Sequence, residues 1–255
     1  MSNTALVPIP SHINRNVSAA RQQTMLAVLG NPRAVYSSEC QNPTAPQISE
    51  LIVHEQVGCL KVRGLRPAVE SLRQVLGKIE QAHPDVYSAL GHAGMLCARF
   101  VRNSTTAVSN HSWGTAIDLT LDGVLDIRGD GRVQQGLVKI APIFNDGGWF
   151  WGAGFRTEDA MHFECSDDLV RSWAVDGKLG NPARAAAATA SLLSLGDRGP
   201  DVAKVQTALN RNGSQLLVDG EFGRNTLAAV MAFQASRHLV ADGVVGEKTL
   251  AALFS

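Results

Sequence analysis

Two separated stretches carry the residues around which the chain is expected to fold: SNHSWGTAID at residues 109–118 and DAMHFE at residues 159–164. Together they hold two histidines and three carboxylates. Zinc binds imidazole nitrogen and carboxylate oxygen readily, and a hydrolytic zinc site typically has three protein ligands and a fourth position for water. His111, Asp118 and His162 would supply such a set.

The residues around the first stretch favour strands. GMLCARFV at residues 94–101 and IDLTL at residues 117–121 mix apolar and β-favouring side chains over strand-sized lengths. Strands flanking a polar loop would place His111 in the loop and Asp118 on a rigid strand. Gly114 between them would let the backbone pack closely beside a metal.

Outside these stretches, helical periodicity predicts two elements. Residues 19–29 show a modest helical pattern that ends at Gly-Asn-Pro. We expect residues 1 to about 50, which contain it, to wrap around the first domain. Residues 65–83 predict an amphipathic helix, because apolar positions recur at alternating four- and three-residue steps, namely Leu65, Val69, Leu72, Leu76 and Ile79.

The pattern S-x-H-x-x-G-x-A-x-D of residues 109–118, with GWFWG at residues 148–152 and D-x-x-H-F-E at residues 159–164, resembles the M15 family of zinc peptidases. That family contains D-Ala-D-Ala carboxypeptidases and the L-alanyl-D-glutamate endopeptidases of phage lysins. The resemblance covers roughly residues 99–164. It implies an α+β, zinc D,D-peptidase-like catalytic domain with a small, mainly antiparallel sheet.

Carried over position by position, the resemblance implies His111, Asp118 and His162 as ligands of Zn2+ and Asp159 as the general base. Many members have Glu at the base position, whereas the endopeptidase branch often has Asp, which favours an endopeptidase here. Bound zinc lowers the pKa of water to about 7, and a nearby carboxylate can take the proton and pass it to the leaving amine.

A cation is also expected near the developing oxyanion. Arg99 and Arg102 lie upstream of the first ligand, where the family places an arginine, and we prefer Arg102; a surface arginine is the alternative for each. Glu164 either holds a ligand imidazole or is an unrelated strand residue. Ser109 either orients the first loop or has no chemical role.

Other conspicuous residues have simpler interpretations. Residues 122–132 place acidic residues and glycines where calcium ligands could lie, but they lack the EF-hand pattern, so we predict a polar loop. Three tryptophans either wall the cleft or belong to the core: Trp113, Trp149 and Trp151. The other five histidines are expected to be surface or structural residues or stay unassigned: His12, His54, His83, His92 and His238.

The four cysteines are scattered, without a C-x-x-C pair. We expect mostly buried free thiols, with two disulfides as the alternative, among Cys40, Cys59, Cys97 and Cys165.

Length and composition bound the remaining possibilities. A chain of 255 residues with 45% apolar residues allows two compact domains or one large one. Lys plus Arg and Asp plus Glu number 23 each, so nucleic acid is not an expected partner. The N-terminus lacks the basic and apolar regions of a secretory signal, and no apolar run approaches the ~18 residues that span a bilayer.

The composition changes after residue 180. Residues 181–192 form an Ala-rich stretch, which we interpret as a linker. Beyond it, VDGEFGRNTLAAV from Val218 and ADGVVGEKTLAAL from Ala241 match at a shift of 23 residues, which predicts a small domain of two like units. This part resembles the all-α, three-helix peptidoglycan-binding domain type 1.

The two resemblances point to the same polymer. We therefore expect a monomeric, zinc-dependent peptidoglycan hydrolase of the phage-lysin type, with a catalytic domain at 1–180, a linker at 181–192 and a wall-binding domain at 193–255. It would stay in the host cytoplasm until lysis and then cleave the L-Ala-D-Glu bond of bacterial peptidoglycan.

Three alternatives stay open. One is a D-Ala-D-Ala carboxypeptidase, and another is an inactive peptidoglycan-binding protein. The third is a regulator with structural zinc, which would need Glu164 or Cys165 as a fourth ligand.

Overall fold

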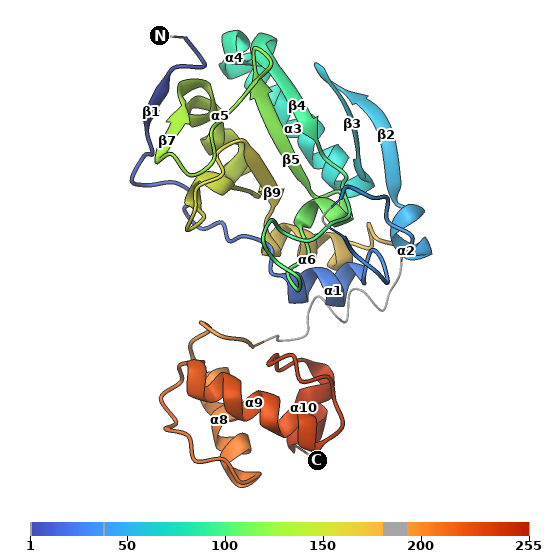
Figure 1. Ribbon diagram of the computed structural model, residues 1–255, viewed down its shortest axis with the longest axis vertical. Helices are drawn as coiled ribbons and strands as arrows, with labels where there is room; N and C mark the ends of the chain where they lie inside the picture. Colours follow the sequence, from blue (N-terminus) through green and yellow to red (C-terminus); the bar gives the residue numbers. More distant parts are fainter. Residues whose placement is uncertain (1, 38, 181–192, 255) are drawn as a thin grey trace. The chain divides into compact units, whose positions relative to one another are not determined.

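The computed structural model describes residues 2–37, 39–180 and 193–254 (Figure 1). The chain divides into two compact units between residues 188 and 189. The predicted linker at 181–192 lies outside the described residues, so the domain limits stay a prediction. Each unit is considered by itself below.

The first unit is built on a five-stranded antiparallel sheet (Figure 1). Its path runs β4-β5-β9-β8, with β6 paired to β5 at the hairpin. The strands are β4 (Leu90–Gly94), β5 (Ala116–Leu121), β6 (Val124–Leu125), β8 (Trp149–Trp151) and β9 (His162–Cys165). The predicted α+β class and the strand at residues 117–121 are confirmed.

The strand predicted at residues 94–101 is wrong. β4 ends at Gly94, after an irregularity in its register with β5. The following backbone bonds go elsewhere, because Cys97 N donates to His111 O at 3.0 Å and Ala98 N donates to Gln41 O at 2.8 Å. The segment is therefore tied to two different loops and joins no continuous strand.

Helices and two further strand pairs surround this sheet. The pairs are β1 (Leu6–Pro8) with β7 (Arg132–Gln134), and β2 (Ile52–Val57) with β3 (Leu60–Leu65). The helices are α1 (Gln22–Leu29), α2 (Pro46–Ser49), α3 (Arg66–Ala82), α4 (Pro84–Ala89), α5 (Gln135–Asp146) and α6 (Asp167–Val175), and the short 3-10 turns are η1 (Asn110–Trp113) and η2 (Gly152–Gly154).

Helix α3 confirms the helical periodicity. Its apolar stripe is buried, and it packs against the β2–β3 hairpin and α5. Pro67 lies in the first turn, where its missing N–H costs nothing. The N-terminal wrap is also confirmed, because β1 pairs with β7, Ala19 forms a bridge with Ser166, and α1 packs against α6.

The three tryptophans belong to the core. Trp113, Trp149 and Trp151 are fully buried. Each indole N–H donates a hydrogen bond, respectively to Gly30 O, Ser71 Oγ and Ala160 O. A buried indole needs such a partner, so these side chains brace the sheet and do not wall a cleft.

The expectation of free thiols is wrong for Cys40 and Cys97, which form a disulfide with a Cα–Cα distance of 5.0 Å. The physical reason is an isolated backbone bridge between Gln41 and Ala98, which brings their neighbours together. Such a bridge leaves no periodic sequence signal. Cys59 is free and exposed, and Cys165 is free and buried as expected.

The second unit is all-α, as predicted: α8 (Pro200–Arg211), α9 (Arg224–Ser236) and α10 (Glu247–Phe254) enclose a separate apolar core. Its repeat appears as two matching polar networks. Gln206 Nε2 donates to Asp219, Glu221 O and Thr226, and Gln234 Nε2 donates to the equivalent set Asp242, Val244 O and Thr249. Each network anchors one Asp-Gly turn to a helix.

No helix in the described ranges is long and apolar enough to span a membrane.

Candidate metal centre

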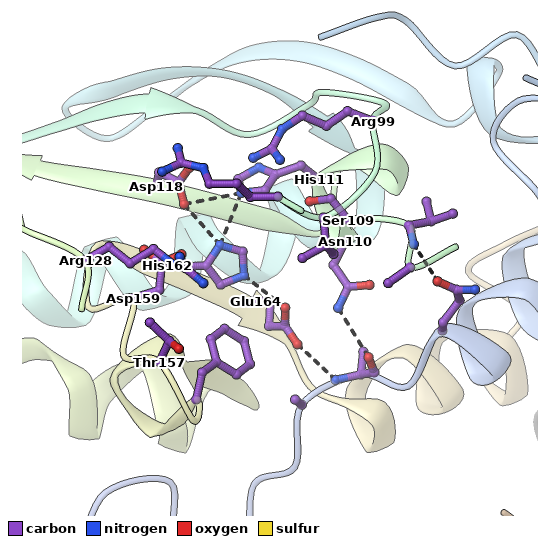
Figure 2. Close-up of a pocket in the computed structure, with 18 of the residues that line it drawn as sticks. Arg99, Ser109, Asn110, His111, Asp118, Arg128, Thr157, Asp159, His162 and Glu164 are labelled. Carbon is purple, nitrogen blue, oxygen red and sulfur yellow. Dashed lines mark hydrogen bonds and ion pairs between the residues drawn. The ribbon is translucent and has the colours of Figure 1, made fainter. Parts of the chain in front are cut away.

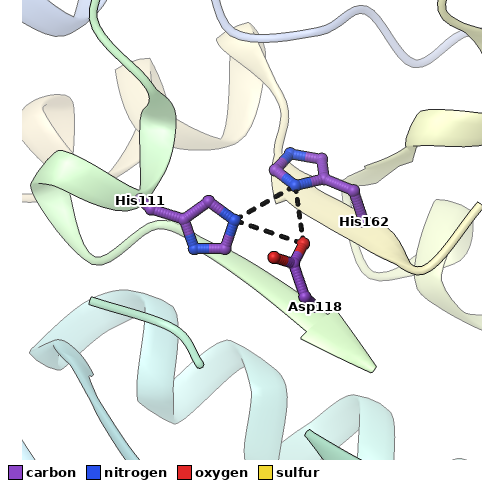
Figure 3. A group of neighbouring side chains, drawn as sticks. All are labelled: His111, Asp118 and His162. Carbon is purple, nitrogen blue, oxygen red and sulfur yellow. Dashed lines mark hydrogen bonds and ion pairs between the residues drawn. The ribbon is translucent and has the colours of Figure 1, made fainter. Parts of the chain in front are cut away.

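Three side chains converge at the centre of the first unit (Figure 3). His162 Nδ1 lies 3.0 Å from Asp118 Oδ1, His111 Nε2 lies 3.3 Å from the same oxygen, and the two nitrogens are 3.2 Å apart. Four tetrahedral ligands at about 2.05 Å from zinc would lie about 3.3 Å from one another. The two imidazole nitrogens and one carboxylate oxygen therefore fit zinc in both chemistry and spacing.

The sheet explains how distant residues meet. Asp118 on β5 and His162 on β9 are directly opposite in the antiparallel register, so their side chains share one face of the sheet. His111 lies in η1, just before β5. This turn closes at Gly114, whose φ of 70° is in the left-handed region and whose carbonyl accepts a hydrogen bond from Leu65 N.

Both imidazoles are held by their second nitrogens. His111 Nδ1 is 3.1 Å from Met95 O, and His162 Nε2 is 2.9 Å from Glu164 Oε2. The other oxygen of Glu164 accepts a hydrogen bond from Ala20 N at 3.2 Å. These contacts fix which nitrogen of each ring faces the centre, as is usual around protein metal sites.

The charges of the site favour a cation at its centre. Burial raises the pKa of Asp118, but hydrogen bonds with His111 and His162 outweigh it and hold this pKa well below its usual range. Burial lowers the pKa of His162, whereas its bonds with Asp118 and Glu164 raise it to about 10. Two carboxylates thus act together to stabilise positive charge between them.

Asp159 lies beside this set. Its segment turns back beside His162, because Asp159 N donates to Gly152 O and His162 N donates to Asp159 O, each at 3.0 Å. Its carboxylate pairs with Arg128 Nε at 3.2 Å. Burial raises the pKa of Asp159 above its ordinary value, although the charges of His162, Arg128 and Arg102 oppose this. A carboxylate with a raised pKa is a better proton acceptor.

A cavity of about 540 Å³ opens onto these residues (Figure 2). This volume suits a short peptide. The cavity brings together all the site residues predicted from sequence: Arg99, Arg102, Ser109, His111, Asp118, Asp159, His162 and Glu164. Arg99 Nη1 donates to Phe100 O at 3.1 Å, whereas Arg102 is exposed at the rim.

A family model from the M15 peptidases, described as D-alanyl-D-alanine carboxypeptidase, matches residues 102–165, and a peptidoglycan binding domain model matches residues 198–253. The chain combines an M15 peptidase domain with a peptidoglycan-binding domain.

Several solved structures share segments with it. A Burkholderia AP3 phage endolysin is 49% identical over 25% of this chain and 24% of its own, with a TM-score of 0.25. A fused Zn-dependent amidase/peptidase/peptidoglycan-binding domain-containing protein from Clostridium acetobutylicum is 34% identical over 26% and 30%, with a TM-score of 0.26. A peptidoglycan-binding protein from Clostridioides difficile is 33% identical over 25% and 40%, with a TM-score of 0.25. The chain thus spans less than half the length of each.

Two arginines of the peptidase domain's cavity were missed from sequence. Arg128 comes from the loop between β6 and β7, and Arg156 comes from the loop between η2 and β9. Nothing in their local sequence distinguishes them from surface arginines. Only the folding of both loops over the metal centre gives them a place in the site.

Residues 122–132 comprise the turn before β6, the strand β6 itself and the loop that leads to β7. Asp126 turns inward, and its Oδ2 accepts a hydrogen bond from Gln134 N at 2.6 Å. Among the described residues of the peptidase domain, His111, Asp118 and His162 are the one group of ligand side chains that converges. None of the other five histidines or the free Cys165 joins this group.

Proposed function

We propose that the protein is a zinc-dependent peptidoglycan hydrolase that cleaves the L-Ala-D-Glu amide bond of the stem peptide. The observation that carries the proposal is the convergence of two imidazoles and a carboxylate beside Asp159, in one cavity. The match of the C-terminal part to a peptidoglycan-binding domain supports peptidoglycan as the polymer that is cleaved. In this proposal the catalytic domain is 1–180, and 193–255 attach it to the wall.

Each residue of the site has a distinct role in this reaction. Zinc held by His111, Asp118 and His162 would polarise the scissile carbonyl and lower the pKa of a bound water. Asp159 would take a proton from the attacking water and pass it to the leaving amine. Arg102, which lines the same cavity, stabilises the negative charge that develops on the carbonyl oxygen.

The neighbouring contacts keep this arrangement rigid. Arg128 holds the carboxylate of Asp159 in the cavity. Glu164 holds the ring of His162, and Met95 O holds the ring of His111. Pre-positioned groups of this kind avoid the cost of reorganising side chains during the reaction.

Removal of a terminal D-Ala is a second candidate, because the matching family model is described as a D-alanyl-D-alanine carboxypeptidase. The shorter base, Asp159 where many members have Glu, favours the endopeptidase.

The test is mass spectrometry of purified peptidoglycan digested by the wild type, by Asp159→Ala and by Asp146→Ala, with the zinc content of each measured. Asp146 is an exposed aspartate at the end of α5 and serves as the matched control. We expect fragments with new L-Ala carboxyl and D-Glu amino ends from the wild type and the control. Asp159→Ala should keep its zinc and release nothing.

The other outcomes are equally informative. Free D-Ala as the only product would identify the carboxypeptidase and refute the endopeptidase. Zinc-loaded wild type without any product would identify an inactive wall-binding protein. Full activity of Asp159→Ala would refute the role of Asp159.

A further inference from the structure

The cavity over the metal centre has a cluster of four guanidinium groups, which we call the arginine cluster: Arg99, Arg102, Arg128 and Arg156. They come from three separate segments, those before η1, between β6 and β7, and between η2 and β9. Arg99 and Arg128 can be followed around the ligands in Figure 2. No feature of the proposed proton transfer requires so many cations.

The carboxylates of the cavity are already engaged. Asp118 bonds with both histidines, Asp159 pairs with Arg128, and Glu164 bonds with His162 and Ala20 N. No carboxylate in the described part of the chain forms an ion pair with the other three members of the cluster, Arg99, Arg102 and Arg156. Arg102 is assigned to the oxyanion in the proposed function, so Arg99 and Arg156 are available to an anionic ligand.

The charge balance of the cavity points the same way. Four arginines and three carboxylates, Asp118, Asp159 and Glu164, leave one positive charge with neutral histidines, and a bound Zn2+ would raise it to three. The whole chain has equal numbers of acidic and basic residues, so this local excess does not follow from composition. A cavity with low-dielectric walls strengthens such a field and concentrates anions.

Guanidinium groups identify the class of anion. Arginine presents a planar fork of N–H donors that matches a carboxylate, often through two parallel hydrogen bonds. In both reactions considered above, the residue that supplies the leaving amine also carries a free α-carboxylate: D-Glu in one and terminal D-Ala in the other. A carboxylate next to the scissile bond is thus the feature common to both substrates.

We propose that Arg99 and Arg156 bind the free carboxylate of the residue that supplies the leaving amine, so that the enzyme selects stem peptides with this group unmodified and rejects those in which it is amidated. The inference rests on the proposed function, and it names the substrate class of the same site. If the inference holds, peptidoglycan whose D-Glu is amidated resists cleavage by this enzyme.

The first experiment compares three peptides with the wild type and needs no variant: N-acetyl-L-Ala-γ-D-Glu-L-Lys-D-Ala-D-Ala, its D-isoglutamine form and its C-terminal amide. Only one carboxylate changes in each comparison. Amidation next to the bond that is cut should lower kcat/KM about tenfold or more, because a charge-assisted hydrogen bond contributes roughly 1.5–3 kcal/mol. Amidation at the other position should matter less.

The second experiment assigns the effect to the arginines. Arg156→Gln should lower kcat/KM for the free-acid peptide and leave that for the amidated peptide nearly unchanged, and Arg99→Gln identifies any shared contribution. Arg102→Gln should lower kcat/KM for both peptides, because Arg102 is assigned to the oxyanion. Arg66→Gln is the matched control, because Arg66 is exposed on α3 and does not line the cavity. Calorimetric titration of Asp159→Asn with the same peptides measures binding without turnover, and Kd should show the same preference.

Each result decides between the alternatives. Equal kcat/KM and Kd for free and amidated peptides would overturn the inference while the proposed function stands. Discrimination that persists in both Arg99→Gln and Arg156→Gln would overturn the role of these arginines. If the enzyme digests purified peptidoglycan but cleaves none of the peptides, this result would also count against the inference. If the enzyme cleaves neither the peptides nor peptidoglycan, the proposed function itself would be refuted.

Discussion

Glu164 links the ligand His162 to the N-terminal segment through its two oxygens, one on the imidazole and one on Ala20 N. Glu164→Gln should keep the fold but weaken zinc binding about 10- to 100-fold, because a neutral amide holds the imidazole less firmly and lowers its basicity. Zinc affinity measured by competition with a chelator checks this. Glu70→Gln, exposed on α3, is the control, and an unchanged affinity in Glu164→Gln would reduce Glu164 to a packing residue.

Asp126 is a buried carboxylate with an unusual pKa. Burial and the charges of Asp130, Glu158 and Asp159 raise its pKa to about 6, against the hydrogen bond from Gln134 N. Its unfolded pKa is about 3.9. The raised value means that folding favours the protonated form, so the contribution to stability is present below about pH 4 and lost as the pH rises through about 6.

Asp126→Asn should therefore raise stability at pH 7 by about 1–2 kcal/mol and flatten its pH dependence between pH 4 and 6. The amide keeps an acceptor for Gln134 N, and its NH2 group replaces Asp126 Oδ1, a buried oxygen that has no partner among the described residues. Thermal unfolding from pH 4.5 to 7.5 measures the effect. A variant as pH-dependent as the wild type would show that another group titrates.

At the level of single residues, side-chain type could be predicted from sequence better than side-chain partner. His111, Asp118, His162 and Asp159 stood out because their chemistry and spacing are specific. Arg128 could not be recognised, because its role depends on an ion pair with Asp159 across 31 residues of chain, and the pattern of residues 122–132 drew attention to the acidic residues instead. The pairing of Cys40 with Cys97 was missed for the same reason.

Among the elements, α3 and β5 were predictable because burial of one face imposes a period on the sequence. Residues 95–101 have the same apolar character as a strand, yet their backbone hydrogen bonds go to residues of separate loops, namely 37, 41, 107, 109 and 111. Contacts with these distant loops, and not the local sequence, determine the conformation of residues 95–101. The register of β5 with β9, which sets Asp118 opposite His162, likewise depends on pairing that one strand's sequence does not contain.

Gly114, at the end of η1, has neither the backbone conformation nor the space for a side chain. Its φ is 70°, and a Cβ would lie 2.7 Å from Leu65 N and 2.9 Å from Gly64 Cα, which are backbone atoms. Gly114→Ala should therefore lower the free energy of unfolding by at least about 1–2 kcal/mol and displace η1 with His111. Gly77→Ala is a matched control within α3, where a Cβ meets nothing within 4 Å.

Chemical denaturation of both variants measures the contrast. Gly77→Ala should be about 0.5–1 kcal/mol more stable than the wild type, because alanine restricts the unfolded chain and favours helix. Zinc affinity should fall in Gly114→Ala alone. Equal stabilities for the two variants would mean that the contact between η1 and β3 is loose.

On the scale of the whole molecule, each unit has its own apolar core, and the two cores share no residue. The second unit contains the same arrangement twice, at Gln206 and at Gln234. In each case a buried glutamine amide forms hydrogen bonds with the aspartate side chain and the glycine N–H of an Asp-Gly turn. Because the cores are separate, we expect the proposed catalysis and wall binding to be separable, with attachment raising the local concentration of enzyme on the wall.

Removal of residues 193–255 should accordingly leave kcat/KM on a soluble stem peptide within about twofold of the full chain. The clearing of a peptidoglycan suspension at nanomolar enzyme should slow by about tenfold or more, because tethering commonly strengthens binding by 10²-fold or more. Turbidity and peptide turnover measured on the same preparations separate the two effects. A truncated chain that clears walls as fast as the full chain would show that the arginine-lined cavity alone supplies the affinity for the wall, whereas loss of peptide turnover would show that the catalytic unit depends on its partner for folding.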